Sequence, residues 1–185
     1  MESVLQGHSD FVALAMHFAT EAHGAQMRKY GGGRYIEHPI SVMNRLPSNA
    51  TDATKAAALL HDVVEDCGVT IETIEAKFGP EVAKLVGELT DVSKPSEGNR
   101  KVRKALDLRH TAEASRDAQT IKVCDLIDNS LSIIEAAKEN KEAEAFLKVY
   151  MAEKKALLAV LGRADSLCHG VAQSIVDYYY ATVAS

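Results

Sequence analysis

The sequence predicts an all-α fold, a helical bundle around one hydrophobic core, and two features of the chain support this prediction. Apolar residues recur at the spacing of amphipathic helices along nearly the whole chain. No segment of useful length alternates apolar and polar residues as a half-buried strand does, and no internal repeat or low-complexity tract occurs. At 185 residues the chain is long enough to bury a sizeable core. We therefore expect a single domain over residues 1–185.

The first two helices are indicated by a cap and by a proline. Residues 11–22 carry one apolar face, and Ser9 or Asp10 can serve as the N-cap of this helix. The glycine triplet at 31–33 then interrupts the helical pattern. Pro39 suits the first turn of a second helix, because proline is tolerated where backbone N–H groups have no intrahelical partner.

The third helix is expected over residues 56–64, capped by Thr51 or Asp52 and ended near Gly68. Pro95 and Gly98 make residues 94–99 the loosest stretch, which we interpret as a surface loop. The remaining helices are expected at residues 70–78, 80–89, 102–114, 117–137, 141–161 and 164–183.

Composition excludes several classes of partner. The chain has 21 Lys and Arg against 26 Asp and Glu, so its formal net charge of −5 argues against binding a nucleic acid polymer. A locally basic site could still bind a phosphorylated small molecule. No apolar run approaches the roughly 20 residues of a membrane span, so we expect no membrane partner. Met1-Glu2-Ser3 does not begin a secretory signal. Three widely spaced cysteines are typical of free thiols, and we expect a cytoplasmic protein.

The end of the third helix combines an apolar body with a polar cluster. His61 and Glu65 are four residues apart, as are Asp62 and Asp66, so two stacked pairs are expected. Three carboxylates at a helix C-terminus oppose the helix dipole and repel one another. A divalent metal would relieve this repulsion, with His61 and Asp62 as ligands and with Glu65 and Asp66 available for proton transfer. The alternative is a solvated helix end, but the apolar context argues against it.

Further ligands are expected from elsewhere in the chain. His38 stands directly before Pro39 at a helix start, where its side chain can point inward, although a core or capping histidine is the alternative. Asp125 lies within an apolar helical stretch, and a buried carboxylate needs a partner. Basic residues that would hold phosphate oxygens beside a metal, or else lie on a solvated surface, are Arg28, Lys29, Arg34, Arg100, Lys101, Arg103 and Lys104.

These motifs together resemble the HD-domain phosphohydrolases, and among them the alarmone hydrolases of the RelA/SpoT type. The resemblance covers roughly residues 11–150. Its motifs are Arg28-Lys29, Tyr35-Ile36-Glu37-His38-Pro39-Ile40, Ala57-Ala58-Leu59-Leu60-His61-Asp62-Val63-Val64-Glu65-Asp66, Phe78-Gly79-Pro80-Glu81-Val82, Thr90-Asp91, Arg100-Lys101 and Lys122-Val123-Cys124-Asp125-Leu126-Ile127-Asp128-Asn129. Since no synthetase domain fits in 185 residues, the chain is similar to a stand-alone small alarmone hydrolase.

The resemblance implies a role for each matching residue. The metal ligands of the family, which usually holds Mn²⁺, match His38, His61, Asp62 and Asp125. Their mix of imidazole and carboxylate would also accept another divalent transition metal such as Fe, Co, Ni or Zn. The acidic pair that activates the hydrolytic water matches Glu65 and Asp66. Residues near the nucleotide match Arg28, Lys29, Asn129 and Tyr150.

The implied reaction removes pyrophosphate from the 3′ position of the alarmones ppGpp and pppGpp, with the adenine analogues ppApp and pppApp as further candidates. A phosphatase of the same type acting on NADPH or on nucleoside monophosphates is the alternative. A third hypothesis is a non-catalytic nucleotide-binding module. It is disfavoured because every residue that the chemistry needs is present.

Three positions depart from the family pattern. Cys67 and Gly68 follow the Glu-Asp pair where threonine is common, and Leu126 stands where Lys or Arg usually follows the late metal ligand. Asp128 occupies a position that often carries an aromatic residue or histidine. We expect these changes to keep the metal site but to make the substrate region more negative, which would alter nucleotide preference.

Overall fold

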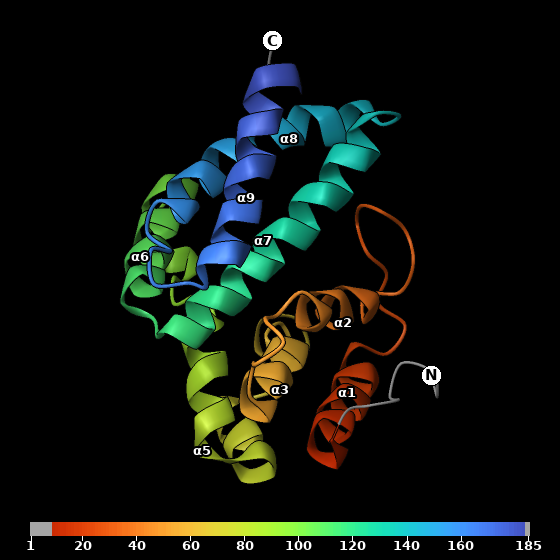
Figure 1. Ribbon diagram of the computed structural model, residues 1–185, viewed down its shortest axis with the longest axis vertical. Coiled ribbons are helices and arrows are strands. Elements are labelled where there is room, and N and C mark those ends of the chain that lie inside the picture. The colour runs from red at the N-terminus through yellow and green to blue at the C-terminus, as the bar shows by residue number, and fades with distance from the viewer. Residues whose placement is uncertain (1–8, 184–185) are drawn as a thin grey trace.

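A computed structural model describes residues 9–183 and confirms the all-α prediction (Figure 1). Within these residues no strand forms, and the β interactions reduce to one isolated bridge between Met27 and Arg34. The helices are α1 (Asp10–His23), α2 (Glu37–Asn44), α3 (Asp52–Leu60), α4 (Val63–Asp66), α5 (Ile71–Leu89), α6 (Arg100–Glu113), α7 (Arg116–Ala137), α8 (Lys141–Leu158) and α9 (Ser166–Tyr178), with a 3₁₀ turn at Pro95–Glu97 and a π-helical turn at Tyr179–Val183.

Helix α7 is the central element of the bundle. It packs against α2, α3 and α5 on one side and against α8 and α9 on the other, as Figure 1 shows. Twelve of its residues are buried, among them Ile121, Leu126 and the two carboxylates Asp125 and Asp128. The buried face of α7 therefore places two carboxylates inside the core among apolar side chains.

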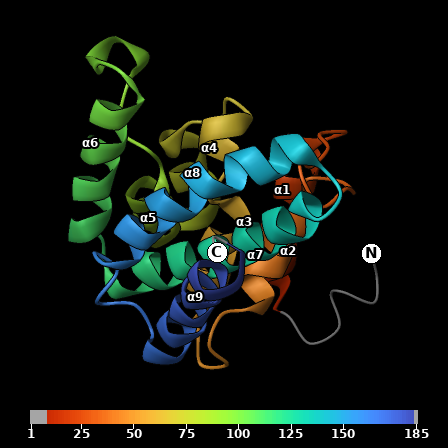
Figure 2. The same cartoon turned by 90° about the horizontal axis from the view of Figure 1, so that it is seen from above.

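Helix α6 has a different environment from the other long helices. In the view from above it stands at one edge of the molecule, beside α5 and α8 (Figure 2). Among its residues only Asp107 and Thr111 are buried, so most of its polar surface is accessible. Residues of α6, α7 and α8 line a common cavity, which is described below.

The expectation of one continuous helix over residues 56–64 is wrong. Helix α3 ends at Leu60, a turn follows at His61 and Asp62, and α4 begins at Val63. The cause lies in a side chain: His61 Nδ1 bonds the Ala58 carbonyl at 2.8 Å, an acceptor that a continuous helix would pair with the amide of Asp62.

Other boundaries agree with the sequence to within a few residues. Ser9, Thr51 and Thr70 cap α1, α3 and α5 through their side-chain oxygens. The expected break at Gly79 appears as a kink inside α5, where φ of +84° favours glycine. The last two helices are shorter than expected, because residues 159–165 form the turn between α8 and α9.

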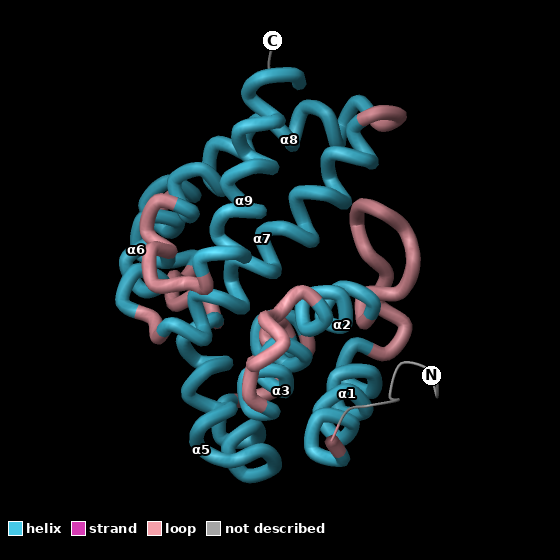
Figure 3. The backbone as a smooth tube through the Cα atoms, in the orientation of Figure 1, coloured by secondary structure: helices cyan, strands magenta, loops and turns pink. Residues whose placement is uncertain are grey.

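Residues 24–36 form a long loop that connects α1 to α2, and Figure 3 shows it rising from α1 beside α7. Arg28 ties it to α7 through a hydrogen bond from Nη2 to Ser132 Oγ at 2.9 Å. Among the described residues, no helix is sufficiently long and apolar to cross a membrane.

Candidate active site

A cavity of about 570 Å³ lies between α6, α7 and α8 and reaches the turn between α3 and α4. Its acidic lining residues are Asp62, Glu65, Asp91, Asp107, Asp125 and Glu153. Its basic lining residues are Arg100, Lys101, Lys104, Lys122 and Lys154. Tyr35, Asn129, Phe146 and Tyr150 also face it. The lining therefore mixes carboxylates with cations, and two of the cations are paired with lining acids: Arg100 with Glu153, and Lys104 with Asp91 and Asp107.

The four side chains expected to hold a metal converge at one end of this cavity. His61 Nε2 lies 3.0 Å from Asp62 Oδ2, and His38 Nε2 lies 3.6 Å from the same oxygen. Asp125 Oδ1 lies 3.2 Å from His38 Nε2 and 3.9 Å from His61 Nε2. These residues come from α2, the α3–α4 turn and α7, so the fold brings together positions that are up to 87 residues apart (125 − 38).

Each of these side chains has a second partner that fixes its orientation. His38 Nδ1 contacts Asp128 Oδ2 at 2.8 Å, and His61 Nδ1 contacts the Ala58 carbonyl at 2.8 Å. Because both Nδ1 atoms face acceptors, the Nε2 atoms carry the lone pairs that a metal needs. The carboxylates are likewise held by Tyr35 Oη, which donates to Asp62 Oδ2 at 2.6 Å, and by Asn129 Nδ2, which donates to Asp125 Oδ1 at 2.5 Å.

The residues present fit a divalent cation. His38 Nε2 and His61 Nε2 are buried, make no hydrogen bond and face the carboxylates, so two imidazole nitrogens are placed to bind a cation in place of a proton. Two imidazoles with two carboxylates form a donor set suited to a first-row transition metal. The surroundings attract positive charge: burial disfavours the charged imidazole, but Asp125 and Asp128 outweigh it and raise the pKa of His38 to about 9.

Charge coupling also keeps both carboxylates ionised. Burial opposes ionisation of Asp62 and Asp125, yet neighbouring imidazoles hold the pKa of each carboxyl well below its usual range. His61 is the main favourable neighbour of Asp62, and His38 is that of Asp125. Both groups therefore provide anionic oxygens at neutral pH.

The acidic pair Glu65 and Asp66 is divided by the structure. Glu65 lines the cavity, and its Oε1 accepts a hydrogen bond of 2.7 Å from the Asp91 amide. Partial desolvation there raises the pKa of Glu65 above its ordinary value, which favours proton exchange. Asp66 is absent from the cavity lining, and its carboxylate accepts a hydrogen bond from Gln26 at 3.2 Å. The two acids thus face different surroundings, because successive helical residues point in different directions, and their joint role in proton transfer stays a prediction.

The four residues expected near the nucleotide occupy two adjoining spaces. Asn129 and Tyr150 line the main cavity. Arg28 and Lys29 line a hollow of about 120 Å³, which shares Tyr35 and Asn129 with that cavity. Arg28 also forms an ion pair with Asp128, whose Oδ2 lies 3.0 Å from Arg28 Nη2.

Lys154 is a cavity residue that sequence reasoning missed, and Lys122 was noted only as part of a motif. Lys122 Nζ donates to the Leu89 carbonyl at 3.2 Å, and nearby carboxylates raise its pKa despite burial. Burial lowers the pKa of Lys154, whose Nζ lies 4.9 Å from the centre of the Tyr150 ring. Helical spacing offered a signal for Lys154, because it follows Tyr150 by four residues on α8.

The residues that depart from the family pattern lie outside the cavity lining, and their effect on nucleotide preference stays a prediction. Leu126 is fully buried in the core, and neither it nor Asp128 belongs to the cavity lining. Asp128 lies behind His38, with Arg28 and Arg45 as charge partners. Cys67 also lies outside the cavity, with its sulfur 3.3 Å from His23 Nδ1.

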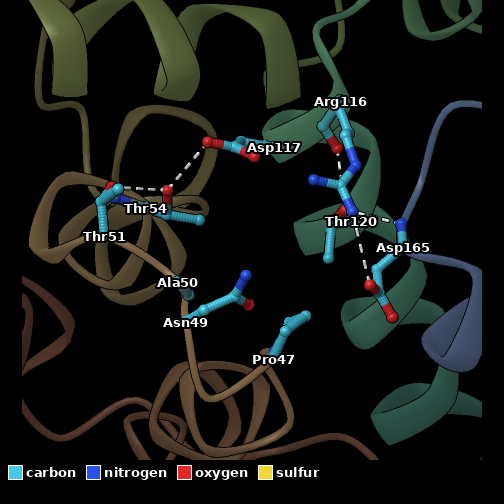
Figure 4. A pocket seen from close by; sticks show the side chains of 9 residues that line it. All are labelled: Pro47, Asn49, Ala50, Thr51, Thr54, Arg116, Asp117, Thr120 and Asp165. Carbon is cyan, nitrogen blue, oxygen red and sulfur yellow. Dashed lines mark hydrogen bonds and ion pairs between the residues drawn. The ribbon is translucent and has the colours of Figure 1, made fainter.

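A separate hollow of about 200 Å³ lies at the start of α7, away from these residues (Figure 4). Its polar side chains are paired with one another: Thr54 Oγ1 donates to Asp117, and Arg116 contacts Asp165. Thr120 Oγ1 accepts a hydrogen bond from the Asp165 amide. These pairs join the beginnings of α3, α7 and α9, which is a structural function.

The chain is similar to proteins of a known family. The family model described as HD domain matches residues 15–155. A guanosine-3′,5′-bis(diphosphate) 3′-pyrophosphohydrolase of Aquifex aeolicus is 38% identical over 149 residues, which are 77% of this chain and 21% of that protein. The chain thus spans about a fifth of the length of this relative.

Shorter relatives match over more of their length. The guanosine-3′,5′-bis(diphosphate) 3′-pyrophosphohydrolase MESH1 of Xenopus tropicalis is 39% identical over 119 residues, covering 62% of this chain and 65% of that protein. A solved structure of a metazoan ortholog of SpoT, described as hydrolyzing ppGpp, matches with a TM-score of 0.80 and 28% identity. That match covers 92% of this chain and 96% of the other.

Proposed function

This chain belongs to the HD domain family, and on that basis we propose that it is a metal-dependent phosphohydrolase that removes pyrophosphate from the 3′ position of alarmone nucleotides. One observation carries the proposal. Two buried imidazole nitrogens without hydrogen-bond partners face two carboxylates beside a cavity that is also lined by five Lys and Arg side chains. The names of the relatives in Aquifex aeolicus and Xenopus tropicalis support the choice of reaction.

The metal would be held by His38, His61, Asp62 and Asp125. When bound, such an ion lowers the pKa of a water molecule and offsets charge on phosphoryl oxygens. The donor set supports Mn²⁺ as the ion, because mixed imidazole and carboxylate ligands suit it.

The chain's own residues supply the remaining functions. Glu65 is the base that receives the proton of the attacking water, and its raised pKa suits that role. Asn129 orients the substrate beside Asp125, to which its amide is already bound. Lys122 and Lys154, together with α6 cations such as Lys101, would stabilise negative charge on the phosphate oxygens.

The nucleotide would extend from the metal end across the cavity. Tyr150 and Phe146 form an aromatic wall, with ring centres 5.8 Å apart, on which a base or ribose can pack. Arg28 and Lys29 border the adjoining hollow, and Lys29 lies over the Tyr30 and Phe146 rings. The proposal keeps these residues near the substrate and assigns Asp66 no direct part in proton transfer.

The cellular setting is also a proposal. Cys67, Cys124 and Cys168 are free thiols, which supports a reducing compartment such as the cytoplasm. We treat residues 1–185 as one catalytic domain with a small phosphorylated nucleotide as its partner.

A product-resolved substrate panel tests the proposal. Purified protein with Mn²⁺ is incubated with ppGpp, ppApp, NADPH and nucleoside monophosphates, and pyrophosphate and orthophosphate are measured separately. We expect pyrophosphate from ppGpp or ppApp and its loss in Glu65→Gln. Orthophosphate from NADPH or a monophosphate alone would instead identify a nucleotide phosphatase, and binding without turnover would identify a non-catalytic module.

A further inference from the structure

Asp128 is a buried carboxylate directly behind the candidate metal site. The residue is 5% exposed and does not line the cavity. Oδ2 lies 2.8 Å from His38 Nδ1 and 3.0 Å from Arg28 Nη2. Oδ1 accepts hydrogen bonds from Ser41 Oγ at 2.5 Å and from Arg45 Nη2 at 3.2 Å. Its two oxygens therefore have four partners, which fix the position of the carboxylate.

His38 is the imidazole that this carboxylate orients. A carboxylate on Nδ1 keeps the proton on that nitrogen, directs the Nε2 lone pair into the site and increases its electron density. His61 has a weaker orienting partner, since its Nδ1 faces the neutral Ala58 carbonyl. The two candidate histidine ligands thus differ in the charge of the group behind them.

The charge of Asp128 is balanced locally. Arg28 and Arg45 both contact it, so a buried carboxylate can remain ionised without drawing on the charge of the cavity. Arg45 and Ser41 lie on or directly after α2, the helix that carries His38. The contacts of Asp128 with His38, Ser41 and Arg45 therefore connect α7 to α2.

We propose that Asp128 is a positioning residue that holds His38 toward the metal and thereby sets the affinity of the site for a divalent cation. This inference rests on the metal site of the proposed function. It concerns metal binding, and Asp128 is assigned no contact with substrate.

The test measures Mn²⁺ binding directly, by the electron paramagnetic resonance signal of free Mn²⁺ during titration of the full chain. We expect Asp128→Asn, which keeps the shape but removes the charge, to raise the dissociation constant by about 10–100-fold. Asp117→Asn is the matched control, because Asp117 lies on the same helix and accepts a hydrogen bond from Thr54 away from the site. Its dissociation constant should equal that of the wild type. An unchanged constant in Asp128→Asn would overturn the proposal.

A second variant keeps the test decisive if Asp128→Asn does not fold. Ser41→Ala removes only the 2.5 Å hydrogen bond to Oδ1 and should weaken Mn²⁺ binding by a smaller factor. The Nδ1 proton of His38 should also give a downfield NMR signal in the wild type that moves upfield in the folded variants. Equal Mn²⁺ affinity of Ser41→Ala and wild type, with an unmoved signal, would refute the positioning role.

Catalysis separates this inference from the proposed function. At saturating Mn²⁺ the kcat of Asp128→Asn should return toward the wild-type value, and without metal its circular dichroism spectrum should equal that of the wild type, which a general loss of structure would alter. Wild-type protein that binds Mn²⁺ without hydrolysing any alarmone would contradict the proposed function alone. Wild-type protein that binds no divalent cation would contradict both.

Discussion

Mn²⁺ should stabilise the folded chain strongly, because the proposed site exists only in the folded state. His38, the His61–Asp62 turn and Asp125 lie on separate parts of the chain, and folding brings each imidazole Nε2 within 4 Å of an oxygen of both carboxylates. An ion that binds all of them has no comparable site in the unfolded chain. Its binding energy therefore adds to the free energy of unfolding.

The expected size follows from mass action. At a free Mn²⁺ concentration about 100 times the dissociation constant, stabilisation is about 2.7 kcal/mol. For a chain of this length, about 1 kcal/mol shifts the Tm by roughly 2–4 °C. The Tm should therefore rise by roughly 5–11 °C on addition of Mn²⁺.

Thermal unfolding followed by circular dichroism measures this shift after dialysis against chelator and titration with Mn²⁺. Asp125→Asn, which preserves the side-chain shape, should lose most of the shift. Glu65→Gln should retain it, because Glu65 lines the cavity without belonging to the proposed ligand set. An equal shift in Asp125→Asn and wild type, or no shift in the wild type at concentrations that support activity, would refute the reasoning.

Three further outcomes are expected. Tyr35→Phe removes the donor to Asp62 and should weaken Mn²⁺ binding by about 10-fold in calorimetry, and unchanged affinity would deny that contact a role. Because the folded pKa of Glu65 is raised above 4.5, its stabilisation is complete below that pH and is lost as pH rises through the folded value. Glu65→Gln should therefore gain stability relative to wild type across that window in urea unfolding with chelator present, and a pH-independent difference would contradict this. Leu59→Ala, at a fully buried position, should lower the free energy of unfolding by about 2–5 kcal/mol. Leu167→Ala, at a position 76% exposed, should change it by less than about 0.5 kcal/mol. Similar losses in the two variants would argue against this core.

The helical pattern predicted the bundle well but could not predict the turn at His61. Residues 56–64 are apolar at nearly every position, so the local pattern favours one continuous helix. The interruption depends on the imidazole of His61 taking the Ala58 carbonyl, a contact that no periodicity encodes. Asp62 lies in this turn, and its Oδ2 lies 3.0 Å from His61 Nε2 and 3.6 Å from His38 Nε2.

The candidate ligands were predictable because polar residues within apolar helices need partners. The same logic applied to Asp128, yet its sequence position beside Asn129 suggested a place near substrate. Its actual place depends on the packing of α2 against α7, which brings Ser41 and Arg45 to its carboxylate. Asp66 shows another limit: its adjacency to Glu65 did not predict the hydrogen bond that its carboxylate accepts from Gln26.

Anomalous diffraction from crystals grown with Mn²⁺ tests the central claim most directly, namely that two histidines and two aspartates of this chain hold the catalytic ion. We expect one strong peak at about 2.0–2.4 Å from Nε2 of His38 and His61 and from one oxygen each of Asp62 and Asp125. A strong peak at another position, with none among these four side chains, would contradict the account.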